Sequence, residues 1–560
     1  MFSPRFFTLA CAATVWIGLS AAWQKRPFTS KQLREIGYDP SFEGPLPYFG
    51  DPYADPSVYL LDIALTTSGD ANKSHVYLKY LTGSDPNNSQ ISRRNIREVR
   101  IRGSPEIGDL SLVENVFSKL ERLDRVYWEY PDGIPASILQ SIEKNNPSCQ
   151  IYYKHRDYYS SHNPNDGSEA WKFTHSPNLY SLKAEVIYGG KDNFHDLEFI
   201  FNVLSTAPNL KMLDLHLHHA GCVYGGANPY AFDFKSHPSV RFPPLEVLRL
   251  DGYQLEERTD AGYEWYFKGF GWGRRWARGE KGDGRTSLDA WREAMDWSHL
   301  HTLDILGQTN ITLNTLRYDM ELPALRNLTI SAGWREFTNE ETISLATYPA
   351  NPLEAISLKD FDVKVGEDLL DRFSSNPASI SELKHFSFGA RSTDIGFLPQ
   401  EKISKFISNS PKLEKLDLAI PRHVNMSTKY EPFKSFISSP TIQHLTLRFP
   451  SADDYEYEIA DGSTSQFDYS SMEVSWADMD TEKGNIPDPL INKETAQGLF
   501  KSLRTAKKGD ELKRLDLIVG NWDGRHGHKE YLLGEGIRMR VALWRCWVVG
   551  LEGMERCEGE

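Results

Sequence analysis

Aromatic and arginine side chains crowd one stretch of the chain, residues 263–297, in a pattern that suits a binding site. The stretch begins YEWYFKGFGWGRRWARG and ends DAWREAMDW. Trp, Tyr and Arg are the side chains that most often anchor a protein interface, and aromatic rings also stack on sugars and guanidinium groups. The candidate binding residues are therefore Trp265, Trp272, Arg274, Arg275 and Trp276. The alternative interpretation is that the rings of this stretch pack it onto the rest of the fold.

Histidines and a cysteine gather at LDLHLHHAGC, residues 213–222. In a strand His216 and His218 share one face, and zinc takes His and Cys ligands in sets of four. The alternation with leucines already accounts for these histidines as exposed strand residues, so we predict no metal and no cofactor here. The glycine-rich run GFGWGRRWARG lacks the G-K-[ST] ending of a phosphate loop.

The net charge of −14 on 560 residues argues against a nucleic-acid partner, because phosphate binding needs clustered Lys and Arg. Much of that charge is local. Between Asp453 and Glu482 there are ten acidic residues and no Lys or Arg. We interpret this stretch as a solvated acidic loop; calcium capture is the alternative, although the sequence has no EF-hand spacing.

Local catalytic motifs such as G-x-S-x-G, H-E-x-x-H and paired C-x-x-C are absent from the sequence. This favours a non-catalytic protein with no catalytic residue to assign. An enzyme whose site assembles from distant loop positions is the alternative.

A recurring pattern of leucines predicts the elements that position these residues. The motif is L-x-x-L-x-L, with Ile, Val or Phe also allowed, and most neighbouring copies are 25 to 30 residues apart. In LDL the two leucines point to one face of a short strand and the aspartate to the other. One such unit cannot bury its own apolar face, so neighbouring units must stack in parallel. The clear copies begin at Leu210, Leu245, Leu300, Leu325, Leu353, Leu383, Leu413, Ile442 and Leu512.

Amphipathic helices precede several of these strands. HDLEFIFNVLST, EKISKFISN and EPFKSFIS place apolar residues three and four positions apart. Each run ends at Ala-Pro or Ser-Pro, where proline stops the helix and favours an extended predecessor. Helix, proline stop, turn and short strand together form one repeat.

This unit resembles the long, irregular leucine-rich repeats of ribonuclease-inhibitor-like proteins and of the F-box/LRR proteins of filamentous fungi. The resemblance covers about residues 95–521. It implies an α/β leucine-rich-repeat solenoid, a horseshoe with parallel strands on the concave face and helices outside. His218 and Tyr253 stand where that family has Asn or Cys, and no F-box motif of the L-P-x-E-[IL] type precedes the repeats.

The expected organisation follows from these patterns. Residues 1–22 form a signal peptide, residues 23–94 an extended or capping region, and residues 95–521 the irregular solenoid, with inserts at 256–297 and 451–485. The last stretch, 522–560, contains EGIRMRVALWRCWVVGLEG, whose apolar residues at 541, 544, 547, 548 and 551 predict a C-terminal capping helix.

The N-terminus indicates a secretory address. A single charge at Arg5 precedes a mostly apolar run of 14 residues and the small residues Ser20, Ala21 and Ala22, which together are typical of a cleaved signal peptide. The run is too short for a stable membrane anchor. Glycosylation sequons are candidate modification sites and lie at Asn72, Asn87, Asn310, Asn327 and Asn425.

Removing the signal peptide leaves Cys149, Cys222, Cys546 and Cys557, an even number that permits disulfides without pairing them. On one unbroken helix Cys546 and Cys557 would be about 16 Å apart, too far to bridge. They can pair only if that helix breaks near Gly550 or Gly553.

The sequence therefore favours a secreted, glycosylated, non-catalytic leucine-rich-repeat protein that binds a protein or glycan partner through its concave face and the aromatic insert. The alternative is an intracellular F-box/LRR-like substrate-recognition protein with a degenerate F-box. That alternative holds if the N-terminal apolar run is not a signal.

Overall fold

A computed structural model gives the fold, and the chain divides into two units that are described separately. Unit 1 comprises Met1–Leu248 and Glu257–Asp296, and unit 2 comprises Arg249–Glu256 and Trp297–Glu560. The structure describes residues 60–65, 78, 81, 96–103, 110–130, 133–156, 175–188, 194–219, 231–235, 237–255, 263–268, 271–276, 285–306, 310–332, 339–347, 352–390, 397–420, 431–449, 493–519, 529–533, 537–549 and 554–559.

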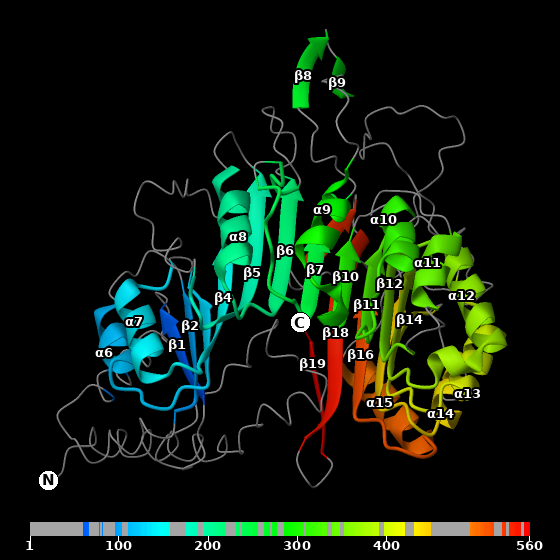
Figure 1. The fold of residues 1–560 in the computed structure, drawn as a ribbon. Helices are drawn as coiled ribbons and strands as arrows, with labels where there is room; N and C mark the ends of the chain where they lie inside the picture. The colour runs from blue at the N-terminus through cyan, green and yellow to red at the C-terminus, as the bar shows by residue number, and fades with distance from the viewer. Residues whose placement is uncertain are drawn as a thin grey trace, which may run out of the picture. The chain divides into compact units, whose positions relative to one another are not determined.

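Unit 1 is built on parallel strands that pair in chain order (Figure 1). They are β1 (Leu60–Leu65), β2 (Glu98–Gly103), β3 (Arg125–Glu129), β4 (Gln150–Arg156), β5 (Leu179–Tyr188) and β6 (Met212–His219). The helices of this unit are α6 (Ser111–Phe117), α7 (Ala136–Asn145), α8 (Phe194–Thr206) and α9 (Ser287–Ala294). Because β1 lies within the region 23–94, the parallel sheet begins before residue 95.

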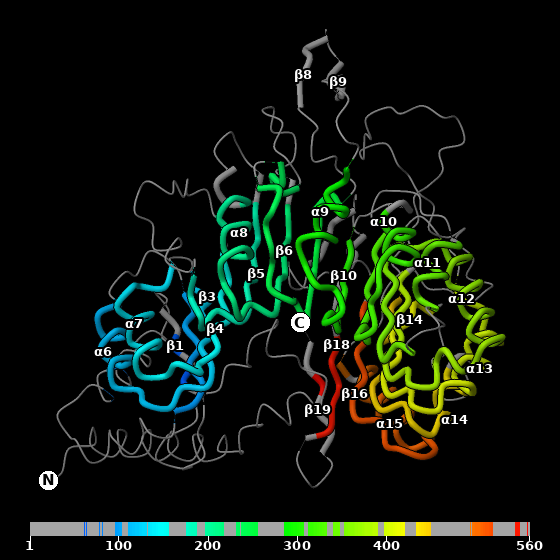
Figure 2. The backbone as a smooth tube through the Cα atoms, in the orientation of Figure 1, coloured from blue at the N-terminus to red at the C-terminus, as the bar shows by residue number. Residues whose placement is uncertain are grey.

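Unit 2 repeats the same arrangement, with its helices in a row along one side of the strands (Figures 1 and 2). The parallel strands are β10 (Thr302–Leu306), β11 (Asn327–Ser331), β12 (Ala355–Phe361), β13 (His385–Ala390), β14 (Lys415–Ala419), β15 (His444–Phe449) and β16 (Arg514–Val519). The helices are α10 (Asn310–Asn314), α11 (Asn339–Ala346), α12 (Val363–Ser375), α13 (Gln400–Asn409), α14 (Glu431–Ser438) and α15 (Lys493–Ala506). Short turns of other helix types are η3 (Trp297–His299), η4 (Thr315–Asp319) and η5 (Pro377–Ile380).

Three further strands, β7 to β9, follow β6 in the chain. The strand β7 (Val247–Asp251) contributes its first two residues to unit 1 and the others to unit 2. The strands β8 (Tyr263–Lys268) and β9 (Gly271–Trp276) form an antiparallel pair within the aromatic insert.

The predicted leucine repeats form the core of both units. Every one of the clear L-x-x-L-x-L copies has all three of its apolar side chains buried, each at 2% exposure or less. Their partners are the apolar faces of the helices: the ring centroid of Phe386 on β13 lies 4.7 Å from that of Phe406 on α13. The predicted α/β fold of stacked strand and helix repeats is therefore confirmed, because shared burial of this kind requires neighbouring units in register.

The helix boundaries match the sequence signals. α8, α13 and α14 each end immediately before the predicted Ala-Pro or Ser-Pro pair. α9 begins at a capping box in which Thr286 and Asp289 bond each other's backbone N–H. α12 begins where the Asp362 carboxylate accepts a hydrogen bond from the Lys364 N–H at 2.7 Å.

A regular backbone link joins each turn to the next in unit 2. The N–H groups of Glu414 and Lys415 both donate to the carbonyl of Lys384, at 2.8 Å each. One repeat later, the N–H groups of Gln443 and His444 donate to the carbonyl of Glu414 at 2.8 and 3.0 Å. These backbone hydrogen bonds set the spacing between neighbouring repeats.

The predicted C-terminal capping helix is wrong. The segment forms strands β17 (Lys529–Leu533), β18 (Ile537–Val549) and β19 (Met554–Gly559). β18 runs antiparallel to β16, and β19 antiparallel to β18. The run IRMRVALWRCWVV is rich in β-branched and aromatic residues and alternates apolar with arginine at its start, which favours a strand over the helix that the three- and four-residue spacing suggests.

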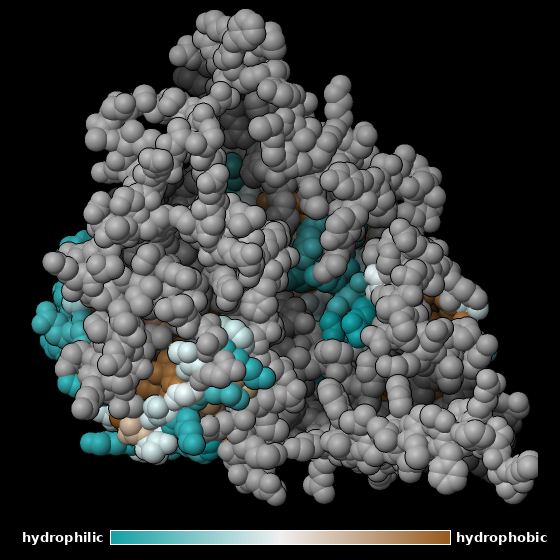
Figure 3. Space-filling view, turned by 180° about the vertical axis from the view of Figure 1, so that it is seen from behind, coloured by the Kyte–Doolittle hydropathy of each residue, from teal (hydrophilic) through white to brown (hydrophobic). Residues whose placement is uncertain are grey.

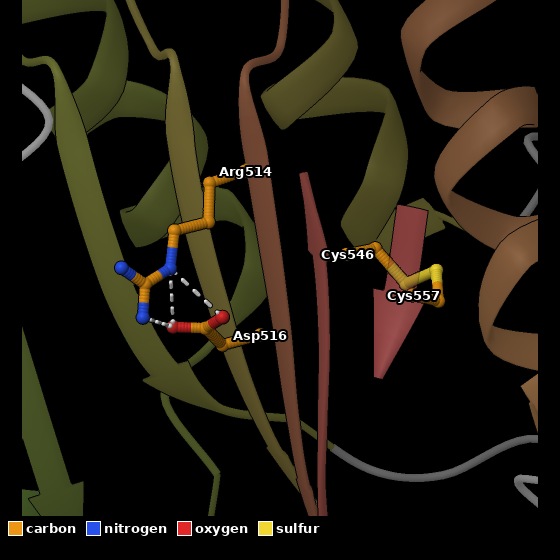
Figure 4. The surroundings of a disulfide bond; sticks show 4 residues. All are labelled: Arg514, Asp516, Cys546 and Cys557. Atoms are coloured by element: carbon orange, nitrogen blue, oxygen red, sulfur yellow. Dashed lines mark hydrogen bonds and ion pairs between the residues drawn. A yellow bond between two sulfur atoms is a disulfide. The ribbon is translucent and has the colours of Figure 1, made fainter. Parts of the chain in front are cut away.

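The same strands settle the pairing of two cysteines. Cys546 and Cys557 face each other in the β18–β19 register and form a disulfide (Figure 4). Cys149 is buried and free. The fourth cysteine, Cys222, lies outside the described residues.

Part of the aromatic insert is a structural element of unit 1. Trp291 on α9 is fully buried, and its ring packs against Phe232, Phe234 and Phe242 at centroid distances of 5.7, 6.4 and 5.0 Å. Packing therefore explains this ring. The signal peptide 1–22 and the acidic stretch 451–485 lie outside the described residues.

Candidate binding surface

The strands of unit 2 have a second face, opposite the leucines and the helices, which we call the strand face. It carries the residue between the two core side chains of each strand, and the parallel register aligns these residues into a central row. All of them are small or acidic. The central row consists of Asp304, Thr329, Ser357, Ser387, Asp417, Thr446 and Asp516.

The acidic members of the central row are paired with arginines. Asp417 accepts hydrogen bonds from Arg448 Nε and a terminal nitrogen, each at 2.8 Å, and from the Ser387 hydroxyl at 3.1 Å. Asp516 accepts bonds from Arg514 Nε at 3.0 Å on its own strand (Figure 4). The Arg249 Nε lies 2.6 Å from Asp304. These pairs hold the carboxylates in fixed positions.

A second row, two residues before the central row, is cationic at one end of unit 2. In the parallel register of β13 to β16, each residue of this row lies opposite the next one. The row runs from His385 through Lys415 and His444 to Arg514. We call these four residues the basic row. Each is half-buried, and no acidic residue stands in this row between β13 and β16.

Burial and neighbouring cations keep both histidines of the basic row neutral. Burial, followed by the charges of Lys415, Arg514 and Lys513, lowers the pKa of His444 to about 3. Burial, followed by the charge of Lys415, lowers the pKa of His385 to about 4, although Asp417 acts in the opposite direction. The basic row therefore holds two neutral imidazoles beside Lys415 and Arg514, and Arg514 is itself ion-paired with Asp516.

The strand face of unit 1 differs, because tyrosines line part of it. The rings of Tyr127 and Tyr152 stack at 4.8 Å, and those of Tyr152 and Tyr180 lie 5.4 Å apart. Tyr127 and Tyr152 are 3% and 9% exposed. Their burial makes them structural side chains, and burial raises the pKa of Tyr127 above its ordinary value.

Ion pairs link the neighbouring strands of unit 1. Arg100 donates two hydrogen bonds to Glu129, at 2.9 and 2.8 Å. Lys183 Nζ lies 3.2 Å from Asp214, and His216 Nε2 lies 2.6 Å from the same carboxylate. The histidine singled out in the sequence thus contacts an aspartate on its own strand. The side chains of His218 and His219 lie outside the described ones.

The candidate residues of the aromatic insert come together on the β8–β9 pair. Register places Trp265 opposite Arg274, Tyr263 opposite Trp276 and Phe267 opposite Trp272. Since neighbours along a strand alternate between faces, positions 265, 272, 274 and 276 share one face of this ribbon and Arg275 takes the other. The side chains themselves lie outside the described part, so their binding role stays a prediction.

The glycosylation candidates fall on different parts of the chain. Asn327 is half-buried at the start of β11, where its amide nitrogen donates to the Thr302 hydroxyl at 3.0 Å. Asn310 begins α10. The others, Asn72, Asn87 and Asn425, lie outside the described residues. Glycosylation stays a prediction at all of these positions.

The surface of the described residues contains both hydrophilic and apolar areas on the side drawn in Figure 3. None of the helices in the described part of the chain combines the length and the apolar composition that a membrane span needs.

Sequence reasoning missed the basic row. Its signal is the residue immediately before the first strand leucine in consecutive repeats: His in HFSF, Lys in KLDL, His in HLTL and Arg in RLDL. Aligning the repeats on their leucines would have placed these residues in one row.

No family model matches the chain, and no curated protein matches its sequence. Among solved structures, a leucine-rich-repeat protein of Leptospira interrogans is similar at 12% identity with a TM-score of 0.25, over 72% of this chain and 93% of that one. The fold of stacked strand and helix repeats described above rests on this chain's own repeats, their burial and their parallel register.

Proposed function

We propose that the chain is a secreted, non-catalytic leucine-rich-repeat protein that binds a protein or glycan partner. In this proposal the strand face of unit 2 and the β8–β9 ribbon of unit 1 are two candidate binding elements, and each is tested by itself. In the horseshoe that the repeats predict, the strand face lines the concave side.

One observation carries the proposal: polar side chains align in register along the strand face, while the leucines of the same strands are buried on the other side. Solenoids present extended surfaces of this kind to large partners. The fixed carboxylates of Asp417 and Asp516, each held by an arginine, supply oriented hydrogen-bonding groups without needing to be ordered on binding.

Partner capture tests this function with two matched variants. Ser357→Arg places a long cation in the central row, whereas Ser408→Arg places the same side chain on the exposed side of α13. We expect the full-length wild type and Ser408→Arg to capture the same partner from medium conditioned by the producing cells, and Ser357→Arg to lose it. Equal capture by both variants contradicts binding through the strand face.

The contribution of the aromatic insert is tested separately. We expect the triple variant Trp265→Ala, Trp272→Ala and Arg275→Ala to lose binding while its circular dichroism spectrum and melting temperature match the wild type. Unchanged binding would show that the β8–β9 ribbon does not take part in partner binding.

Secretion has its own test. N-terminal sequencing of protein recovered from culture medium should begin at Trp23, after cleavage behind Ala22. A retained N-terminus in protein confined to cell extracts, with co-purification of Skp1-like adaptors, would instead favour the intracellular F-box/LRR-like alternative.

A further inference from the structure

The last parallel strand of unit 2, β16, is paired along its outer edge by β18. In this antiparallel register Leu515 lies opposite Cys546, and the Val548 N–H donates to the carbonyl of Lys513 at 3.2 Å. Residues 544–547 of β18 pair with β16 on one side and with β19 on the other. β18 is therefore the middle strand of a three-stranded antiparallel extension of the sheet.

The disulfide between Cys546 and Cys557 lies on the core side of this extension. Cys546 is opposite the fully buried Leu515, and the two cysteines are 0% and 1% exposed. Helix α15 lies against both β18 and β19. Figure 4 shows the bridge on the other side of the strands from the Arg514–Asp516 pair. The bridge thus joins β18 to β19 inside the apolar core of the last repeat.

Opening the bridge weakens the docked state of β18 and β19, because a pair of short strands is only marginally stable by itself. The bridged cysteines are 11 residues apart, and the bridge restricts the conformations of the undocked segment. Its loss should raise the undocked fraction by about 30-fold. Reduction takes two electrons and two protons, which a dithiol reductant supplies as it becomes a disulfide, and leaves two cysteine thiols. Because both sulfurs are buried, the state of the bridge is set when the chain folds.

The edge of β16 that β18 covers is complementary to a second copy of itself. In an antiparallel pair of two β16 strands centred on Leu515, Arg514 of each copy lies opposite Asp516 of the other. Within one chain the Arg514 Nε already lies 3.0 Å from both oxygens of Asp516. The four side chains therefore form a neutral group with alternating charges across the new pair, and opposite charges on facing strands stabilise such pairing. The leucines of both copies stay on the core side.

We propose that the Cys546–Cys557 bridge is a redox switch for dimer formation through β16. With the bridge closed, β18 covers β16 and the chain is a monomer. In a chain that folds with both thiols reduced, β18 and β19 undock, and β16 of a second copy pairs with the open edge. The switch goes beyond the proposed binding function and does not depend on it. It makes the assembly state depend on the redox compartment in which the chain folds.

Sedimentation velocity of the full chain over a concentration series tests the switch. The oxidised wild type should remain a monomer, whereas Cys546→Ser with Cys557→Ser should dimerise as its concentration rises. Wild type refolded in a dithiol reductant should match that double variant, and so should Cys546→Ala with Cys557→Ala, which buries no hydroxyl. Cys149→Ser removes a buried thiol elsewhere in the chain and should leave the oxidised protein monomeric. Circular dichroism checks that each protein keeps its fold.

Hydrogen exchange locates the change in dilute, monomeric samples. The amides of residues 542–547 should exchange at least about tenfold faster in the double serine variant than in the wild type, because β18 undocks more often. The amides of residues 415–419 on β14 should exchange at equal rates in both proteins.

Charge reversal tests the register of the dimer. In the double serine background, Arg514→Asp should weaken dimerisation by about tenfold or more, because two aspartates then lie opposite each other. Adding Asp516→Arg exchanges the two charges and should restore the dimer.

Several results would overturn the proposal. These are a dimeric oxidised wild type, bridge-free variants that stay monomeric, or unchanged exchange at residues 542–547. Equal dimerisation with and without Arg514→Asp, or no recovery on adding Asp516→Arg, would show that the copies do not pair through β16.

Discussion

Asp417 on β14 is held by Arg448 on β15 through two parallel hydrogen bonds of 2.8 Å, across neighbouring strands of the sheet. The Asp417 side chain is 14% exposed and that of Arg448 is 38% exposed. A third bond, from Ser387 on β13, connects the same carboxylate to the strand on its other side. Three consecutive repeats are thus joined on the strand face as well as through the leucine core.

The first prediction concerns this pair. Arg448→Met should lower the free energy of unfolding by about 1 kcal/mol, because it leaves a partly buried carboxylate without its bidentate partner while solvent screens the loss. Adding Asp417→Asn should recover part of that stability, and urea unfolding measures both variants. A double variant that is less stable than Arg448→Met would contradict the pairing.

The second prediction concerns close packing at Gly366 on α12. A Cβ there would lie 2.7 Å from Leu398 Cδ2 and from two ring carbons of Phe388. Gly366→Ala should therefore destabilise the fold by about 1–3 kcal/mol through overpacking. The control is Gly498→Ala on α15, where a Cβ meets nothing within 4 Å. That substitution should stabilise by about 0.5–1 kcal/mol, because alanine favours the helix. Thermal unfolding of the two variants should shift in opposite directions.

The third prediction concerns acid sensitivity. The pKa values of His385 and His444 are lowered to about 4 and about 3 in the folded chain, from an ordinary value near 6.5. The unfolded chain therefore binds protons first, and the stability contributed by these neutral histidines is complete above pH 6.5 and is lost as the pH falls toward 4. The double variant His385→Gln and His444→Gln should lose less stability than the wild type between pH 6.5 and 5. Chemical unfolding at fixed pH values measures this, and parallel curves for the two proteins would refute it.

The fourth prediction concerns the disulfide between Cys546 and Cys557. Its loop spans a separation of 11 residues, and Cys546→Ser with Cys557→Ser should cost about 2–3 kcal/mol of stability. The remaining described cysteine supplies a control within the same molecule. Cys149 is buried, and burial raises its pKa to about 12. Peptide mapping should find Cys149 unlabelled by iodoacetamide in the folded protein and labelled after unfolding.

The leucine repeats could be predicted because their signal is local. Leu413, Leu416 and Leu418 reveal a strand and its core face within six residues, and the Ser-Pro pair before them marks the helix end. The structure confirms each of these features. Such a unit must bury its apolar face, and this requirement leaves few other structures that it can adopt.

The C-terminal strand could not be predicted by the same means. Val541, Trp544, Trp547 and Val548 fit a helical spacing, and a run with so many apolar residues also fits a strand. The antiparallel pairing of β18 with β16, which decides the outcome, joins residues such as Leu515 and Cys546 that are far apart in sequence. Tertiary context overrides local pattern here.

The roles of the buried Asn178 and Asn146 side chains could not be predicted either, because their hydrogen-bonding partners lie in other repeats. Asn178 is buried and its amide nitrogen donates to the carbonyl of Cys149 at 2.7 Å and to that of Pro147 at 3.1 Å. Asn146, one repeat earlier, binds the carbonyl of Leu120 and the N–H of Leu123. An Asn beside Pro in a turn looks ordinary in sequence, and only the stacked repeats supply its partners. The basic row was missed for the same reason.

The antiparallel course of β18 along β16 also has a consequence for self-association. The last strand of a parallel sheet has an exposed edge, and a strand of another molecule can pair with that edge. Repeated pairing of this kind leads to fibres. Here β18 of the same molecule already pairs with the edge of β16, and the Cys546–Cys557 bridge joins β18 to β19. β18 and β19 thus cover the edge of β16 at which a second molecule could otherwise pair its own strand.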